Sequence, residues 1–100
     1  MVNQIENASQ VPSTGVVVID FFATWCGPCQ RIAPSFVELA AKMPKVTFLK
    51  VDVDDAQDLA EQFNVRVLPT FVILRNGATV ARIEGADLAR VLATLEGLGF

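Results

Sequence analysis

Two cysteines, Cys26 and Cys29, are the only ones in the 100-residue chain, and two residues separate them. This spacing allows a reversible disulfide within the chain when the pair opens a helix. A helix start also favours a thiolate, because its free backbone N–H groups and the positive end of the helix macrodipole face the sulfur. We therefore expect thiol–disulfide exchange, with Cys26 as the attacking thiolate. Cys29 lies one turn further in, is expected to be more shielded, and would resolve the mixed disulfide.

The residues between the cysteines, Gly27 and Pro28, bear on the direction of the exchange. A cation or histidine beside the thiolate would stabilise the reduced form and make the protein an oxidant. Gly27 and Pro28 carry no charge and no side-chain donor, and Pro28 also removes one N–H group. The thiolate is then only moderately stabilised, which favours a reductant. The alternative for the pair is a structural disulfide, or two buried thiols that happen to be close.

Asp20 is a second candidate for the chemistry, since it interrupts the apolar run Val16–Phe22. Burial in such a strand raises the pKa of a carboxyl group, which suits a proton acceptor near neutral pH. A partly hydrated aspartate at the strand's end is the alternative. Lys50 lies in the next predicted strand, where it either tunes Asp20 by its charge or is an ordinary exposed lysine.

The elements on either side of the cysteines are predicted to be a buried strand and a helix. Val16–Phe22 is rich in β-branched residues, which is typical of a central strand that is covered on both faces. The helix is predicted from Pro28 to about Met43, with Pro34 inside it and a kink there. Its apolar stripe consists of Ile32, Phe36, Leu39, Ala40 and Met43.

The rest of the chain predicts further strands and helices around this unit. Strands separated by helices and then joined by a hairpin predict one α/β domain over residues 1–100. It would hold a central mixed sheet of four to five strands, with helices on both faces. The expected elements are an edge strand over Val2–Ile5, a helical turn or two over Glu6–Val11, a strand over Val46–Val53, a short helix capped by Asp54 or Asp55 and ending near Asn64, a hairpin of Phe71–Leu74 and Thr79–Ile83 around Asn76-Gly77, and a helix from about Asp87.

Composition excludes several classes of function. The net charge is −3 and no run of Lys or Arg occurs, which argues against binding to nucleic acid or to acidic membranes. Two cysteines and no histidine cannot supply the four ligands of a structural zinc site, and no imidazole is present for Cys–His hydrolysis. The apolar stretch around Val16 is too short to span a bilayer, and the N-terminus has no leader-like pattern. We expect a cytoplasmic monomer.

The sequence resembles the thioredoxin family over most of its length. The resemblance rests on features that follow one another in the family's order along the chain: Asp20, Trp25-Cys26-Gly27-Pro28-Cys29, Pro34, Lys50, Pro69-Thr70, Asn76-Gly77 and Gly85. It implies the thioredoxin fold and the reduction of disulfides in other proteins. It also implies that Asp20 helps to move the proton of Cys29.

The resemblance further implies a substrate-binding surface around Cys26. The Leu68-Pro69 bond is expected to be cis and to lie against the disulfide, with the adjoining backbone pairing with an extended substrate segment. The expected docking residues are Trp25, Gly27, Pro28, Val67, Pro69, Thr70, Gly85 and Ala86. A core aromatic is the alternative for Trp25, and a simple turn glycine is the alternative for Gly85. Phe22 and Val67 depart from the residues most frequent in the family, which bears on partner preference.

No nucleotide or flavin motif occurs in the chain, so we expect no bound cofactor and no metal. The resemblance implies that electrons come from NADPH through an external, flavin-containing thioredoxin reductase. It also implies protein substrates such as peroxiredoxins and reductases that carry disulfides. Two alternatives stay open: a protein-disulfide oxidase or isomerase, and a non-catalytic interaction module on the same fold.

Overall fold

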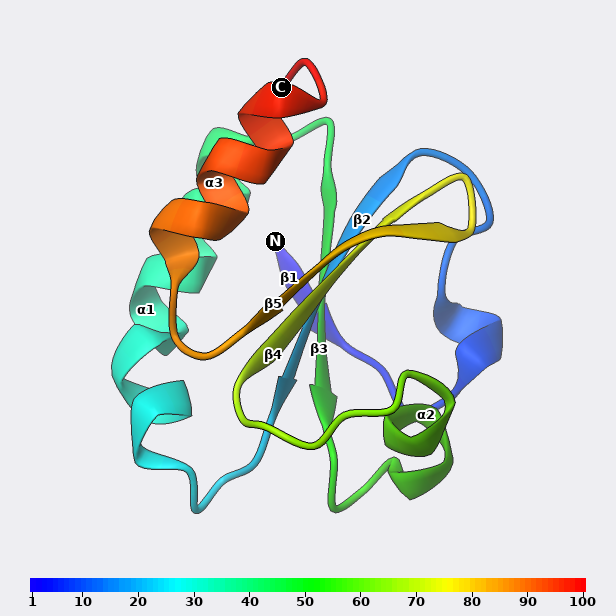
Figure 1. The fold of residues 1–100 in the computed structure, drawn as a ribbon, viewed down its shortest axis with the longest axis vertical. Coiled ribbons are helices and arrows are strands. Elements are labelled where there is room, and N and C mark those ends of the chain that lie inside the picture. Colours follow the sequence, from blue (N-terminus) through cyan, green and yellow to red (C-terminus); the bar gives the residue numbers. More distant parts are fainter.

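The computed structural model describes all 100 residues, and its five strands form one mixed sheet in the order β1-β3-β2-β4-β5. Figure 1 shows α1 and α3 together on one side of this sheet and α2 on the other. The predicted mixed sheet with helices on both faces is confirmed. The elements are β1 (Val2–Gln4), a 3₁₀ turn (Ala8–Gln10), β2 (Val16–Phe22), α1 (Gly27–Lys42), β3 (Thr47–Asp52), α2 (Gln57–Gln62), β4 (Thr70–Arg75), β5 (Ala78–Glu84) and α3 (Leu88–Gly97).

Strand β2 is the centre of the sheet, and its bounds are those that the sequence predicts. It pairs in parallel with β3 on one side and antiparallel with β4 on the other, and all seven of its residues are buried. Successive side chains of a strand point to opposite faces, so a strand covered on both sides needs an unbroken apolar run. Asp20 is the one exception in this run. It points to the same face as Val16 and Val18, which pack in the core beneath α1 and α3.

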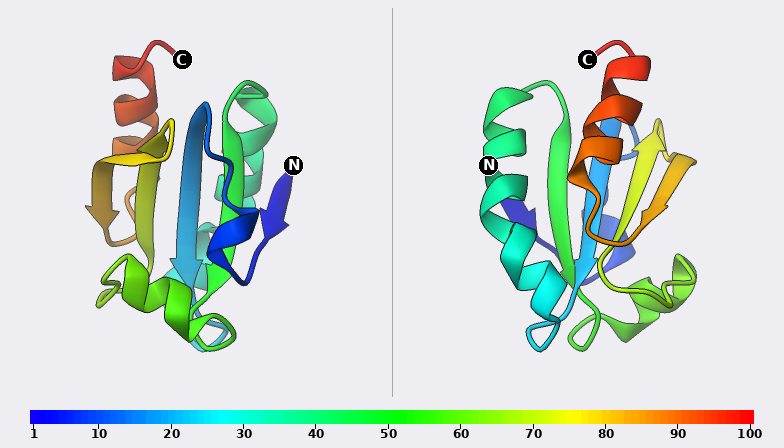
Figure 2. Two further views of the ribbon diagram at one scale, coloured as in Figure 1. Left: turned by 90° about the vertical axis from the view of Figure 1, so that its right-hand side faces the viewer. Right: turned by 60° about the vertical axis from the view of Figure 1, so that its left-hand side comes forward.

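The core has two layers, one on each side of the sheet, and Figure 2 shows the helices that cover them. In the layer under α1 and α3, the Phe36 ring lies between Phe48 and Phe71, with ring centroids 5.5 and 5.7 Å apart. The opposite layer lies under α2 and the N-terminal segment, where Leu59 is buried. Pro34 lies inside α1, which continues beyond it to Lys42, and the kink there stays a prediction. None of the helices combines the length and the apolar character needed to cross a membrane.

Two local predictions have different outcomes. The β4–β5 hairpin turns at Asn76 and Gly77 with φ of 50° and 84°, as a type I′ turn requires, so this prediction is confirmed. The predicted cap of α2 by Asp54 or Asp55 is wrong, because the N-cap residue is Ala56 and no side chain caps the helix. A turn organised by Asp52 occupies this stretch and delays the start of the helix. The Asp52 carboxylate accepts the N–H of Asp54 at 3.0 Å.

Candidate active site

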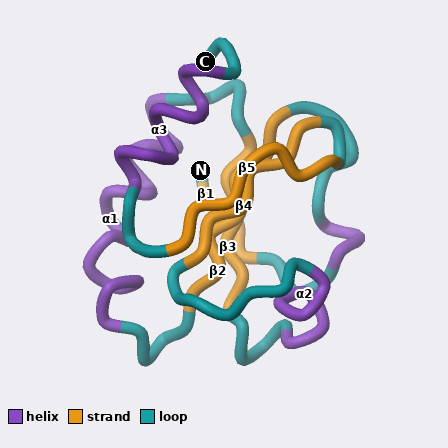
Figure 3. The backbone as a smooth tube through the Cα atoms, in the orientation of Figure 1, coloured by secondary structure: helices purple, strands orange, loops and turns teal.

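The two cysteines form a disulfide at the junction of the loop after β2 with α1, where the tube of Figure 3 changes from loop to helix. Cys26 is the N-cap residue of α1, and the Cα atoms of Cys26 and Cys29 are 5.3 Å apart. The backbone N–H of Cys29 donates a hydrogen bond to Cys26 Sγ at 3.3 Å. An N-cap side chain accepts from the second or third helical residue, and because Pro28 at the second position has no N–H, Cys29 is the donor. The same donor, together with the helix start, would stabilise a thiolate at Cys26 after reduction.

Burial distinguishes the two cysteines only slightly in this disulfide form. Cys26 is 6% exposed and Cys29 is 3% exposed, so the order is the expected one but the difference is small. Both pack with Phe22 and Ala23 in a small apolar cluster at the end of β2. The disulfide therefore lies at the edge of the core, with one sulfur-bearing residue marginally closer to solvent than the other.

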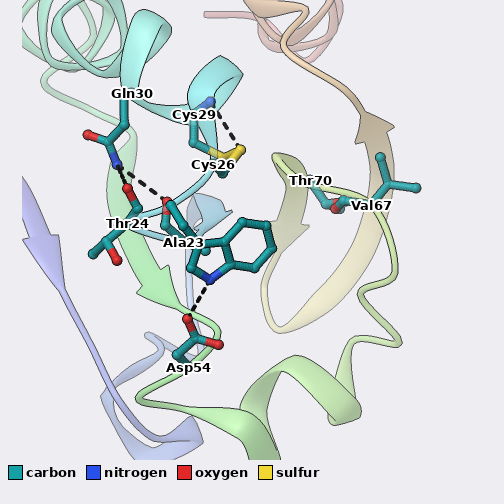
Figure 4. Close-up of a disulfide and its surroundings, with 9 residues drawn as sticks. Ala23, Thr24, Cys26, Cys29, Gln30, Asp54, Val67 and Thr70 are labelled. Carbon is teal, nitrogen blue, oxygen red and sulfur yellow. Dashed lines mark hydrogen bonds between the residues drawn. A yellow bond between two sulfur atoms is a disulfide. The ribbon is translucent and has the colours of Figure 1, made fainter.

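The loop between β2 and α1 is held in place by hydrogen bonds that Figure 4 displays. The Gln30 amide donates to the carbonyl oxygens of Ala23 and Thr24, each at 3.3 Å. In the same loop, Trp25 Nε1 donates to Asp54 Oδ2 at 2.8 Å, while Trp25 stays 70% exposed. The alternative of a core aromatic is therefore excluded for Trp25. Its indole is a fixed apolar surface beside the disulfide.

Asp20 lies beneath this surface, 1% exposed, and its Oδ1 atom has no hydrogen-bond partner. Burial raises the pKa of the Asp20 carboxyl from 3.8 to about 7, and the positive charge of Lys50 opposes part of this rise. The alternative of a partly hydrated aspartate at the strand's end is excluded, since Asp20 is in the middle of β2. Asp20 shares a sheet face with α1, the helix that carries Cys29. A carboxyl that titrates near neutral pH can both accept and release a proton there.

Lys50 is half-buried in β3, directly across from Asp20 in the parallel register. Its ammonium nitrogen lies over the ring of Phe22, 4.3 Å from the ring centroid. The only ion pair in the molecule joins Arg82 to Glu84, so Lys50 does not form one with Asp20. Lys50 is therefore neither a plain surface lysine nor a direct partner of the buried carboxylate.

The segment before β4 forms the other side of the site, and its Leu68-Pro69 bond is cis, as expected. Leu68 packs against the cluster that contains both cysteines. The Thr70 hydroxyl donates to the Val67 carbonyl at 2.5 Å, and the Gly85 N–H donates to the Pro69 carbonyl at 2.8 Å. In Figure 4, Val67 and Thr70 lie to one side of the disulfide, and Ala23 and Thr24 lie to the other. The first bond lies within the segment before β4, and the second joins this segment to the loop before α3.

The predicted site residues thus occupy two levels. Near the surface lie the disulfide and the residues expected to dock substrates, of which Trp25, Gly27, Pro28, Val67 and Ala86 are exposed and Pro69 and Thr70 are buried. Asp20 and Lys50 lie below, on the sheet. No group of three or more potential metal-binding side chains (Cys, His, Asp or Glu) comes together anywhere in the molecule. Gly85 has φ of 103°, a conformation that favours glycine, so its turn role holds alongside its bond to Pro69.

Sequence reasoning missed two residues that organise this site, Asp54 and Gln30. Asp54 follows β3, and Trp25 follows the neighbouring parallel strand β2. The carboxyl ends of neighbouring parallel strands meet at the same edge of a sheet, and this rule is the signal that could have paired the two residues. Gln30 carries no comparable signal, because a glutamine on an exposed helix position is ordinary.

Comparison with known proteins places the chain among thioredoxins. The family model described as thioredoxin matches residues 2–96. A thioredoxin from Equus caballus is 45% identical over 98% of this chain and 99% of its own length. A thioredoxin H-type from Picea mariana is 48% identical over 80% of this chain, and the match spans 66% of that protein, just under two thirds.

Solved structures agree. In the crystal structure of the complex of ferredoxin:thioredoxin reductase and thioredoxin f2, one chain superposes with a TM-score of 0.91 at 33% identity. The superposition covers 99% of this chain and 96% of that chain. The family model, the full-length relative and the shared fold agree with the cysteine pair at the start of α1. The chain belongs to the thioredoxin family.

Proposed function

We propose that the protein is a thiol–disulfide oxidoreductase that reduces disulfides of other proteins, and that residues 1–100 act as one domain. The observation that carries the proposal is the sulfur of Cys26 at the helix start, bonded to Cys29 and accepting the Cys29 N–H. A sulfur in this position is stabilised as a thiolate and has a second sulfur within reach. Those are the two requirements of reversible exchange.

In the proposed reaction the reduced protein supplies two electrons. The Cys26 thiolate attacks one sulfur of the target disulfide, a Cys26–target S–S bond forms, and the target's other sulfur leaves as a thiolate. Asp20 then takes the proton of the Cys29 thiol. The Cys29 thiolate attacks Cys26 Sγ, the target's remaining sulfur leaves, and the Cys26–Cys29 disulfide is restored. Burial, which makes Asp20 a base of near-neutral pKa, supports this role.

The exposed residues around Cys26 are proposed to dock an extended segment of the target. Trp25 and Val67, on either side of the disulfide, expose 70% and 43% of their surface, and apolar surface that gathers around one site favours contact with a partner. The backbone around Pro69 and Thr70 would pair with the segment, and Gly27, Pro28, Gly85 and Ala86 would line its path. Peroxiredoxins and reductases with disulfides are the proposed classes of target.

An external reductase is proposed to regenerate the dithiol. The thioredoxin f2 to which this chain is similar was solved with ferredoxin:thioredoxin reductase, which supports a reductase as partner. We propose a flavin-containing thioredoxin reductase that draws on NADPH, with no cofactor bound to this domain. Consumption of NADPH at 340 nm, with such a reductase and insulin present, tests this source of electrons. Turnover only with a ferredoxin-linked reductase would contradict it.

The reductase activity is tested by insulin reduction in the presence of dithiothreitol. Wild type should accelerate insulin precipitation, Cys26→Ser should not, and Cys29→Ser should accumulate a mixed disulfide with insulin. No acceleration by wild type would favour a non-catalytic interaction module. A reduction potential well above that of the glutathione pool would favour an oxidase or isomerase. We further propose that the protein is cytoplasmic, because one reversible disulfide suits a reducing compartment, and cell fractionation tests this location. We also propose that it is a monomer, which light scattering tests.

A further inference from the structure

Lys50 does not point at its own partner in the sheet. In the parallel register of β2 and β3, Lys50 lies across from Asp20, and Asp52 lies across from Phe22. The Lys50 ammonium nevertheless lies 4.3 Å from the centroid of the Phe22 ring, two residues further along β2 than Asp20. The lysine side chain therefore leans along the sheet toward the aromatic ring of Phe22 and forms no ion pair with Asp20.

The contact with Phe22 is strong enough to matter because both groups are sheltered from water. Phe22 is only 7% exposed and Lys50 is half-buried. A cation over the face of an aromatic ring is attracted by the negative face of the ring, and the attraction grows when water is excluded. Asp20 Oδ1 has no hydrogen-bond partner, so no donor, the Lys50 ammonium included, binds this oxygen.

We propose that Phe22 is a positioning residue for proton transfer, whose ring holds the Lys50 ammonium away from Asp20 and prevents an ion pair between them. The inference rests on the proposed role of Asp20 as proton acceptor. An Asp20–Lys50 ion pair would hold the carboxylate ionised and weaken it as a base for the Cys29 thiol. Phe22 thus keeps the cation close enough to act on Asp20 through space, without binding it.

The charged and titratable groups on this face of the sheet are few. Strand β3 presents Lys50 and Asp52, α1 brings Cys29, and β4 presents Phe71 beside Asp20 and the exposed Arg75 at its far end, across from Val16. The Asp52 carboxylate is engaged by the backbone N–H of Asp54. Burial raises the pKa of Asp20 and the positive charge of Lys50 lowers it in part, so an ammonium held closer to the carboxyl would lower this pKa further.

The test is the NMR titration of the Asp20 carboxyl carbon in the oxidised protein, without substrate. Phe22→Leu removes the ring, and the freed ammonium should move the titration midpoint of Asp20 toward acid by about one pH unit. Phe22→Trp keeps an aromatic face and should leave the midpoint close to that of wild type. Phe22→Met repeats the test if leucine disturbs the fold. Lys50→Met alone should move the midpoint toward alkaline pH.

The decisive control places Phe22→Leu in the Lys50→Met background, where it should no longer shift the midpoint toward acid. Water that enters the space left by the ring would shift the midpoint of Asp20 equally with and without Lys50. Equal shifts in the two backgrounds, no shift, or an alkaline shift with Phe22→Leu alone would overturn the inference. The titration needs no turnover, so its failure is distinguishable from loss of the reductase activity, which insulin reduction reports.

Discussion

Replacing Asp20 by asparagine should stabilise the protein at alkaline pH and have little effect in acid. Asp20 is 1% exposed, and burial raises the pKa of its carboxyl from 3.8 to about 7. The folded state therefore holds this proton more tightly than the unfolded chain does. Asparagine has nearly the same shape as protonated aspartate but never ionises, so it removes the penalty of a buried negative charge.

The sign and the size follow from linkage between protonation and folding. Because the folded pKa is above the unfolded one, the contribution of Asp20 to stability is complete below pH 3.8 and is lost as the pH rises through about 7. The full difference corresponds to about 4 kcal/mol on the scale of about 1.4 kcal/mol per pH unit. We expect Asp20→Asn to exceed wild type by an amount that approaches this value above pH 8.

Urea denaturation of the oxidised forms at pH 4, 6 and 8.5 measures this difference in the free energy of unfolding. Asp55→Asn, which neutralises an exposed carboxylate without a hydrogen bond, is the matched control and should stay within about 0.5 kcal/mol of wild type at each pH. A gap between Asp20→Asn and wild type that is the same at pH 4 and pH 8.5 would refute the assignment of a buried, unpaired carboxyl.

Three further substitutions test the packing and the site. Phe36→Ala empties the space between two aromatic rings and should lower the free energy of unfolding by about 3–5 kcal/mol in urea; a loss below about 1 kcal/mol would contradict its place in the core. Arg82→Met removes the hydrogen bonds of the guanidinium to the carbonyl oxygens of Phe63 and Asn64, and should cost about 1–3 kcal/mol in the same experiment; an unchanged free energy of unfolding would contradict a stabilising role for these bonds. Asp54→Ala frees the Trp25 indole and should raise KM for insulin by about fivefold with kcat little changed, whereas a fall in kcat alone would argue against a docking role.

The sequence by itself determined those features whose causes are local. An apolar strand interrupted only by Asp20, followed by Cys26 and Cys29 at a helix start, predicts both the central strand and a redox pair, because the apolar pattern and the cysteine spacing are local features. The Asn76-Gly77 turn follows in the same way from the left-handed φ that a tight hairpin requires. The cis bond before Pro69 came from the family resemblance, since proline alone favours trans.

Tertiary structure alone decided how distant residues meet. Asp54 accepts the Trp25 indole instead of capping α2, because the carboxyl ends of β2 and β3 lie at one edge of the sheet. Lys50 lies over Phe22 although its register partner is Asp20. The sequence places an aspartate in an apolar strand, but only the packing of helices and strands around Asp20 excludes water and sets how tightly it holds a proton. Desolvation and through-space charge depend on the neighbours in three dimensions, and local sequence does not specify these.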